Sequence, residues 1–111
     1  MDERIRRSRR QERRGAGIFG GTVNAGSGNG ARKNDVRTPT ESIEFKSTKA
    51  ASYSLKLVDL GAAWVHALND NRRMLFGIEF ASRDRGIVPT RYIVMTEDDY
   101  LELRGDDGTA A

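Results

Sequence analysis

The stretch "NDVRTPTESIEFK", residues 34–46, decides how this chain of 111 residues folds. Polar and apolar residues alternate on either side of Pro39, a residue that suits the second position of a turn. The pattern predicts two antiparallel strands joined by a turn at residues 38–41. In this register Val36 lies opposite Ile43, and a slip by one residue would turn the apolar side chains towards water. The sequence therefore predicts a hairpin with one apolar face and one polar face.

Two acids and a lysine share the polar face of this predicted hairpin. Asp35 lies opposite Glu44, and Lys46 follows Glu44 on the same face. Carboxylates that face each other across two strands repel and destabilise the pair. A divalent cation removes that repulsion, and two carboxylates with a backbone carbonyl and waters form an oxygen site suited to magnesium. Such an ion activates water and stabilises charge on a phosphate. The face predicts a metal-dependent phosphodiesterase site, with a solvated polar sheet face as the alternative.

The remaining segments complete a small α/β sandwich, in which a central mixed sheet of about five strands is flanked by helices. The expected order is αβββαββα. Helices are expected at 3–14, within 53–69 and from 97 onward, and strands at 22–24, 35–38, 42–47, 72–82 and 90–96. Residues 1–104 are expected to form one domain that begins with a basic helix, residues 1–14. A mobile glycine-rich loop is expected at 25–34 and a disordered tail at 105–111.

The core is expected to come from the second helix and the last two strands. The strand at 90–96 is almost continuously apolar, which predicts a central position in the sheet. Helical spacing predicts a buried stripe on the second helix that includes its only tryptophan. The residues expected in the core are Leu57, Leu60, Trp64 and Leu68 of the helix and Met74, Phe76, Ile78 and Phe80 of the strand at 72–82.

The composition narrows the class of protein. The chain has no cysteine, which excludes a disulfide framework and thiolate metal sites, and its single histidine argues against zinc. No apolar run reaches the ~20 residues that span a bilayer, so we expect a cytoplasmic protein without a membrane partner. The net charge is +3, but arginines crowd residues 4–14 and acids crowd residues 97–107. A basic end suggests a polyanionic partner such as nucleic acid, or simply a solvated helix.

The ordered set of motifs resembles a known nuclease superfamily. Glu12 lies within "RRQERR", Ser27 begins a Ser-Gly pair, Asp35 follows, and "IEFKST" supplies Glu44 and Lys46. This order is similar to that of the PD-(D/E)XK nucleases, and more specifically to archaeal-type Holliday-junction resolvases and their phage-encoded relatives. The resemblance implies a restriction-endonuclease-like sandwich. The chain departs from the family name at one position, where asparagine replaces proline directly before the aspartate.

The resemblance also implies roles for individual residues. Asp35, Glu44 and Glu12 would hold magnesium, for which manganese substitutes, with help from the Phe45 carbonyl. Lys46 would position the attacking water, so that these four charged residues form the catalytic set. Relatives of this kind are homodimers that cut two strands of a four-way junction. The resemblance therefore implies a magnesium-dependent endonuclease that resolves Holliday junctions in branched double-stranded DNA.

Basic residues are expected to flank the same cleft and to bind DNA phosphates. The resemblance implies that Ser27 contacts the scissile region of the DNA. The other DNA-binding candidates are Arg9, Arg10, Arg13, Arg32, Lys33, Lys49 and Lys56. Two alternatives remain open on the sequence: a nicking or restriction-type nuclease without junction preference, and a DNA-binding accessory protein with an inactive site. His66, on the second helix, is expected to be a packed or solvated side chain.

Overall fold

The computed structural model describes residues 3–23, 34–81 and 88–105, and these form the predicted series of elements. The order αβββαββα is confirmed. The helices are α1 (Glu3–Phe19), α2 (Leu57–Asn69) and α3 (Glu97–Arg104), and the strands are β1 (Thr22–Val23), β2 (Val36–Arg37), β3 (Glu41–Thr48), β4 (Arg73–Phe80) and β5 (Arg91–Val94). No helix within these ranges is both long enough and apolar enough to cross a membrane.

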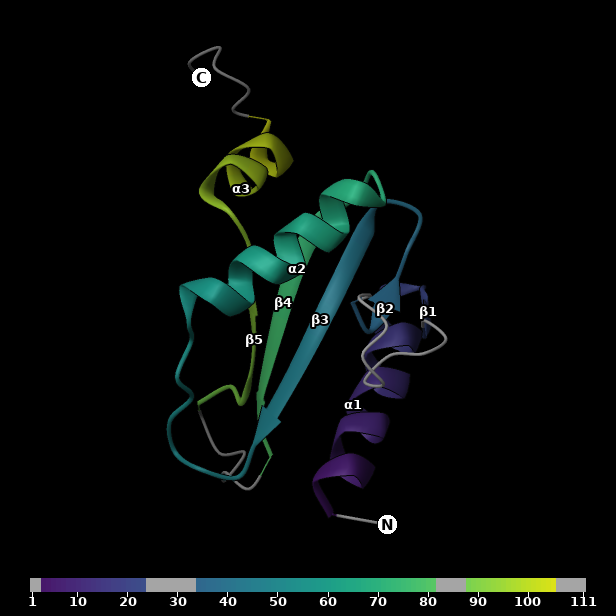
Figure 1. The fold of residues 1–111 in the computed structure, drawn as a ribbon. Coiled ribbons are helices and arrows are strands. Elements are labelled where there is room, and N and C mark those ends of the chain that lie inside the picture. The colour runs from purple at the N-terminus through teal and green to yellow at the C-terminus, as the bar shows by residue number, and fades with distance from the viewer. Residues whose placement is uncertain (1–2, 24–33, 82–87, 106–111) are drawn as a thin grey trace.

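The five strands form one mixed sheet in the order β1-β2-β3-β4-β5 (Figure 1). β3 and β4 are parallel, and every other neighbouring pair is antiparallel. The chain runs from β3 through α2 to β4, because two parallel strands need a crossover connection. The predicted small α/β sandwich with a central mixed sheet is therefore confirmed.

The hairpin has the register that the sequence predicts. Val36 is paired with Ile43, and Arg37 is paired with Ser42. The Thr38 amide donates to the Glu41 carbonyl over 2.9 Å, and the Thr38 hydroxyl accepts from the Glu41 amide over 2.9 Å. Because the hydroxyl and the backbone close the same turn, the register is fixed at its closed end.

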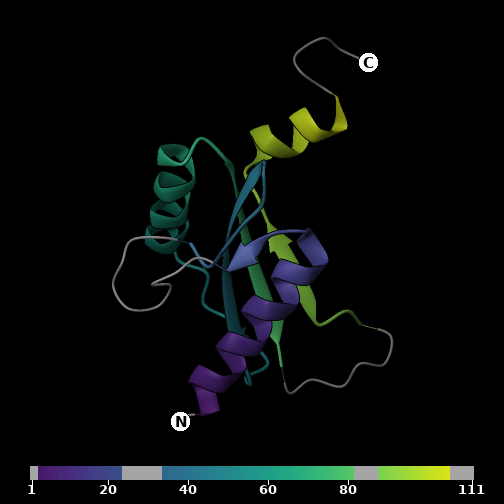
Figure 2. The same cartoon turned by 90° about the vertical axis from the view of Figure 1, so that its right-hand side faces the viewer.

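Two layers of side chains pack on opposite faces of the sheet, and Figures 1 and 2 show the helices that cover them. On the face under α2, the buried residues are Ala63, Ala67, Met74, Phe76 and Ile78. On the face towards α1, they are Val36, Ile43 and Leu75, with Ala16, Phe19, Phe45 and Met95 packed against them. The predicted inward face of β4, from Met74 to Phe80, is confirmed.

The predicted buried stripe of α2 is wrong for its largest members. Leu57, Trp64 and Leu68 are 84%, 44% and 57% exposed. The helix instead buries Ala63 and Ala67, with Leu60 packed beside them. The large residues of β4 already fill this face of the sheet, so the helix approaches it with small side chains. The helical spacing of the predicted stripe was correct, but α2 turns a different face towards the sheet.

Three further features differ from the prediction: the position of β5, the end of α1 and the end of α3. The strand at 90–96 forms β5, which lies at the edge of the sheet rather than at its centre, and its Tyr92 and Ile93 are exposed. α1 continues past Gly15 to Phe19 instead of ending at residue 14. Gly105, expected in the disordered tail, ends α3 in a left-handed conformation that favours glycine.

A close approach between α1 and the sheet explains why Gly15 lies within the helix. A Cβ at Gly15 would overlap the ring of Phe45 in β3. A Cβ at Gly77 in β4 would lie 2.7 Å from Cδ1 of the same ring. Phe45 is thus packed between two glycines, one in the helix and one in the neighbouring strand. This contact sets the distance between α1 and the strand that carries the candidate site.

Candidate metal and phosphodiester site

Asp35 lies directly before β2 and is buried. One of its carboxylate oxygens, Oδ2, accepts a hydrogen bond from the backbone amide of Phe45 over 2.8 Å. The bond crosses from the start of β2 to the middle of β3, beyond the last paired residues of this hairpin. Asp35 is therefore held beside the strand segment that carries Glu44 and Lys46, as the register predicts.

Glu44 and Lys46 lie on the face of β3 that α2 covers. In the parallel register they are opposite Phe76 and Ile78, which belong to the core under α2. Lys46 Nζ lies 3.2 Å from Glu44 Oε2, and both side chains are partly buried. Because the strand alternates, Phe45 points to the opposite face and packs on the core there. The predicted division into a polar and an apolar face is confirmed.

The protonation of this cluster is perturbed. Burial, followed by repulsion from the Asp35 carboxylate, raises the pKa of Glu44 from 4.5 to about 7, although Lys46 acts to lower it and Glu12 adds to the rise. Burial alone would lower the pKa of Lys46, but the Glu44 carboxylate outweighs it, so the pKa of Lys46 is raised. Glu44 thus lies near acids that oppose its ionisation. A bound cation would reduce this electrostatic repulsion.

This raised pKa makes the stability of the metal-free protein depend on pH. Between about 4.5 and about 7 the folded state holds a proton on Glu44 that the unfolded state has lost, so stability falls as the pH rises through this window. The shift corresponds to a loss on the order of 3 kcal/mol. Glu44→Gln should remove this loss, as measured by urea unfolding in EDTA at pH 5 and pH 8.

Glu97→Gln is the control for that measurement, because Glu97 is an exposed acid in the first turn of α3. It should leave the difference between pH 5 and pH 8 unchanged from the native chain. A Glu44→Gln variant whose stability falls between these pH values as much as that of the native chain would show that Glu44 ionises normally.

Glu12 was predicted to hold the metal ion together with Asp35 and Glu44 of the hairpin. Glu12 is partly buried on α1 and influences the pKa of Glu44, so it lies within electrostatic range of the cluster. No group of three or more His, Asp or Glu side chains in the described ranges is placed to hold one metal ion. The arrangement fits a site with two carboxylates, Asp35 and Glu44, completed by a backbone carbonyl and water.

A small hollow of about 120 Å³ opens beside Glu44 and Lys46, between β3 and α2. Asp59 and His66 of α2 also line it, and sequence reasoning missed both for this site. The complete lining is Asn34, Glu44, Lys46, Asp59, Ala62, Ala63, His66 and Phe76. Asp35 is not among these described lining residues. The hollow is large enough for a few waters, and its polar groups come from three separate segments of the chain.

Asn34, the last residue of the predicted glycine-rich loop, has a supporting role beside the site. It is buried, and its side-chain amide donates to the Ser42 hydroxyl over 2.9 Å and to the Ala63 carbonyl over 3.0 Å. These bonds connect the start of the hairpin to β3 and to α2. The position directly before Asp35 thereby anchors that carboxylate. The other residues of the predicted glycine-rich loop, 25–33, lie outside the described residues.

Gln11 of α1 is a second residue that the sequence did not indicate. Its side chain is buried, and Nε2 donates to the Lys46 carbonyl over 2.9 Å. Ala16 of the same helix packs on the core, whereas Arg9 is exposed. Gln11 therefore connects α1 to the strand that carries the lysine.

The predicted DNA-binding residues fall into two groups. Ser27, Arg32 and Lys33 lie outside the described residues. The others are exposed: Arg9, Arg10 and Arg13 on α1, Lys49 after β3, and Lys56 directly before α2.

The cluster consists of two acids and a lysine on a strand hairpin, beside a polar hollow in an α/β sandwich. This arrangement is suited to holding a divalent cation and to orienting a water towards a phosphate. Comparison of the chain with protein-family models, with curated proteins and with solved structures gives no match.

Proposed function

We propose that the chain is a magnesium-dependent DNA endonuclease that cuts four-way junctions. The observation that carries the proposal is the cluster of Asp35, Glu44 and Lys46, in which burial and a neighbouring acid raise the pKa of Glu44 to about 7. Two buried carboxylates that repel each other destabilise a small domain. A bound cation would neutralise them, which explains why the chain has both acids at this place. The proposed substrate, a four-way DNA junction, is taken from the resemblance of the ordered motifs to junction resolvases.

Each residue of the cluster has a distinct role in this proposal. Asp35 and Glu44 would hold the cation, which when bound would neutralise charge on the scissile phosphate. The Phe45 amide orients the Asp35 carboxylate. Lys46, whose amine lies 3.2 Å from Glu44, would position a water for attack on the phosphate. Glu12, on α1, influences Glu44 electrostatically and would add its negative charge to the attraction for the cation.

A cleavage assay on three substrates tests the proposed function. The substrates are a four-way junction, a linear duplex of the same sequence and a single strand, each with magnesium, with manganese and with EDTA. The proposal expects paired incisions in the junction with either metal and no cutting in EDTA. Equal cutting of duplex and junction would favour a nuclease without junction preference. Binding without cutting under either metal would favour a DNA-binding accessory protein.

Paired incision needs two active sites, and α2 offers the surface for a second copy of this chain. Leu57, Val58, Trp64, Val65 and Leu68 are exposed on it, and we call this set the α2 apolar face. The only acidic or basic residues of α2 are Asp59 and His66, which instead line the hollow. A face without charge can pair with its own copy about a two-fold axis. A Cβ at Gly61 would meet open space, so a second helix could approach the backbone there.

Trp64→Ser should dissociate this proposed dimer. Tryptophan at the centre of an interface commonly contributes 2 kcal/mol or more, so the dissociation constant should rise by about 30-fold. Light scattering across a concentration series measures the change. Tyr100→Ser is the control, because it removes an exposed aromatic residue from α3. A native chain that stays monomeric at micromolar concentrations would contradict the dimer, and equal effects of the two variants would contradict this interface.

A further inference from the structure

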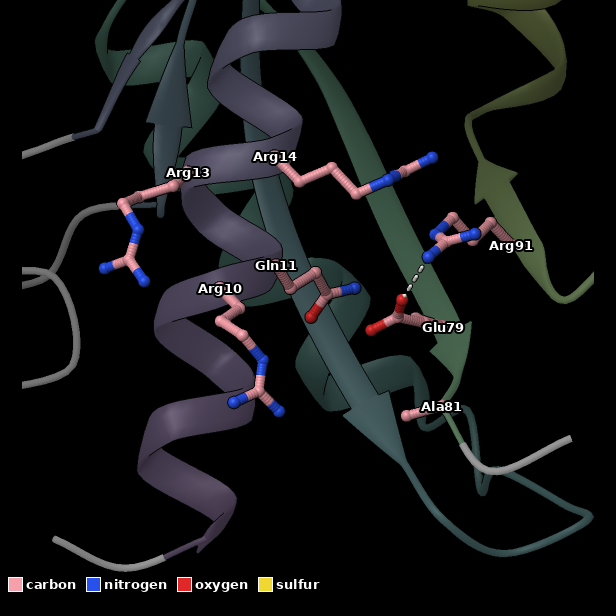
Figure 3. Close-up of a pocket in the computed structure, with 7 residues that line it drawn as sticks. All are labelled: Arg10, Gln11, Arg13, Arg14, Glu79, Ala81 and Arg91. Carbon is pink, nitrogen blue, oxygen red and sulfur yellow. Dashed lines mark ion pairs between the residues drawn. The ribbon is translucent and has the colours of Figure 1, made fainter.

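A second, larger hollow lies on the face of the sheet towards α1, between this helix and strands β4 and β5. Its volume is about 430 Å³, and its charged lining consists of four arginines and one glutamate. We call it the arginine hollow; Figure 3 shows its lining residues, Arg10, Gln11, Arg13, Arg14, Glu79, Ala81 and Arg91. The excess of positive charge indicates an anionic ligand.

The single acid of the arginine hollow is engaged with the wall. Glu79 lies 2.8 Å from Arg91 as an ion pair, and its other carboxylate oxygen accepts from the Ser47 hydroxyl over 3.3 Å. Glu79 therefore fixes Arg91 at the floor of the hollow. Figure 3 shows Arg14 extending from α1 towards Arg91, so guanidinium groups from a helix and from a strand approach the same space.

Two buried polar atoms of the lining have no hydrogen-bond partner within the part of the chain that the structure describes. They are Nε of Arg91, a donor, and Oε1 of Gln11, an acceptor. Unsatisfied buried polar atoms are uncommon, and each costs free energy until a ligand or water reaches it. A DNA backbone phosphate offers acceptors to the guanidinium, and water ordered around it offers a donor to the glutamine oxygen.

The arginine hollow is separate from the metal and phosphodiester site. Glu79 follows Ile78, whose side chain packs in the core under α2, so the acid points to the opposite face of β4. Glu44 and Lys46 lie on the face under α2. A phosphate in the arginine hollow is therefore not the phosphate that the cluster would cut.

We propose that the arginine hollow binds a backbone phosphate of a second DNA segment, away from the segment that is cut. The inference rests on the proposed function for the identity of the polymer. Guanidinium groups bind phosphate oxygens in pairs, so arginines from two elements can hold one phosphate. Exposed Arg4, Arg6 and Arg9 continue the charge along α1 beyond the hollow. At about 1.5 Å rise per residue, the exposed arginines of α1 extend along the helix over more length than one phosphate, which favours a polymer over a small anion.

The test measures DNA binding in EDTA, where the outcome does not depend on cleavage. The variant Arg10→Ala/Arg14→Ala removes two arginines of the hollow and leaves the Glu79–Arg91 pair in place. Affinity for a four-way junction should fall about 10-fold. The slope of log K against log salt should become less steep by about one, because binding releases fewer counterions once one phosphate contact is lost. Thermal unfolding of the variant confirms that it is folded.

The control variant is Arg37→Ala/Arg104→Ala, which removes the same charge from the exposed residues Arg37 of β2 and Arg104 of α3. This control should change the salt slope by less than half the change that Arg10→Ala/Arg14→Ala causes. A short duplex of about one helical turn is the second control, because it cannot fill both sites. The hollow variant should lose much less affinity for this duplex than for the junction.

Three results would overturn the inference. The first is an equal loss of affinity in the two double variants. The second is an equal loss on the short duplex and on the junction, which would place the arginines at the cleavage cleft. The third is tight binding of inorganic phosphate to the hollow without any change in DNA affinity, which would make it a small-anion site. An inactive protein that still shows the expected binding pattern would contradict the proposed function alone.

Discussion

Lys46→Ala should abolish metal-dependent cleavage of a four-way junction while DNA binding persists. The amine lies 3.2 Å from Glu44 and beside the polar hollow, where it can orient a water towards a phosphate. Positioned side chains of this kind contribute about 10²- to 10⁴-fold to a rate, so the single-turnover rate constant should fall by at least about 100-fold. Single-turnover cleavage with saturating protein measures it without interference from binding.

Lys49→Ala is the matched control, because it removes the same side chain from an exposed position just after β3. It should weaken DNA binding and leave the single-turnover rate constant within a few-fold of the native value. If Lys46→Ala cleaved as fast as Lys49→Ala at saturation, Lys46 would be a phosphate contact rather than a catalytic residue.

Gly77→Ala should destabilise the fold strongly. The added Cβ would lie 2.7 Å and 2.8 Å from two ring carbons of Phe45, and the ring is closely packed against Gly15 of α1 on its other side. Neither β4 nor α1 can move without separating the core between them. Overpacking of this kind costs roughly 2–3 kcal/mol, and urea unfolding measures the loss.

Gly17→Ala is the control, because a Cβ at this position of α1 meets nothing within 4 Å. It should stabilise the protein by up to about 1 kcal/mol, since alanine favours a helix over glycine. A Gly77→Ala variant as stable as the native chain would mean that the ring of Phe45 has room to move. The site would then lack the rigid packing that holds the Phe45 amide against Asp35.

The hairpin was predictable because the sequence contains two independent constraints on its register. The turn at Pro39 sets which residues face each other, and the alternation of Val36, Ile43 and Phe45 sets which side is buried. Both constraints agree, so the positions of the candidate acids and the lysine followed from the sequence.

The faces of α2 and the position of β5 were not predictable in the same way. Size and hydrophobicity favoured Trp64 and Leu57 as core residues, but the contact surface was already filled by the side chains of β4. Only the tertiary packing decides that Ala63 and Ala67 face inward. An apolar strand such as β5 is typical of a sheet centre, and its edge position follows from the pairing alone.

The supporting residues of the site were missed because their roles are not local. Gln11 and Asn34 are polar residues in unremarkable sequence, and their hydrogen bonds reach Lys46 and Ala63 across 35 and 29 residues. His66 was expected to be packed or solvated, and its place in the lining of the small hollow depends on how α2 crosses β3. Sequence spacing contains no signal for such contacts.

The central claim is that Asp35 and Glu44 share a divalent cation, and a magnesium titration followed by thermal unfolding at pH 8 tests it most directly. At this pH Glu44 is ionised, and the repulsion that magnesium would relieve is largest. The account predicts that millimolar magnesium raises the unfolding midpoint of the native chain by several degrees, because a ligand of the folded state stabilises it. The same titration should have little effect on Asp35→Asn. A native midpoint that does not respond to magnesium or manganese would contradict the account.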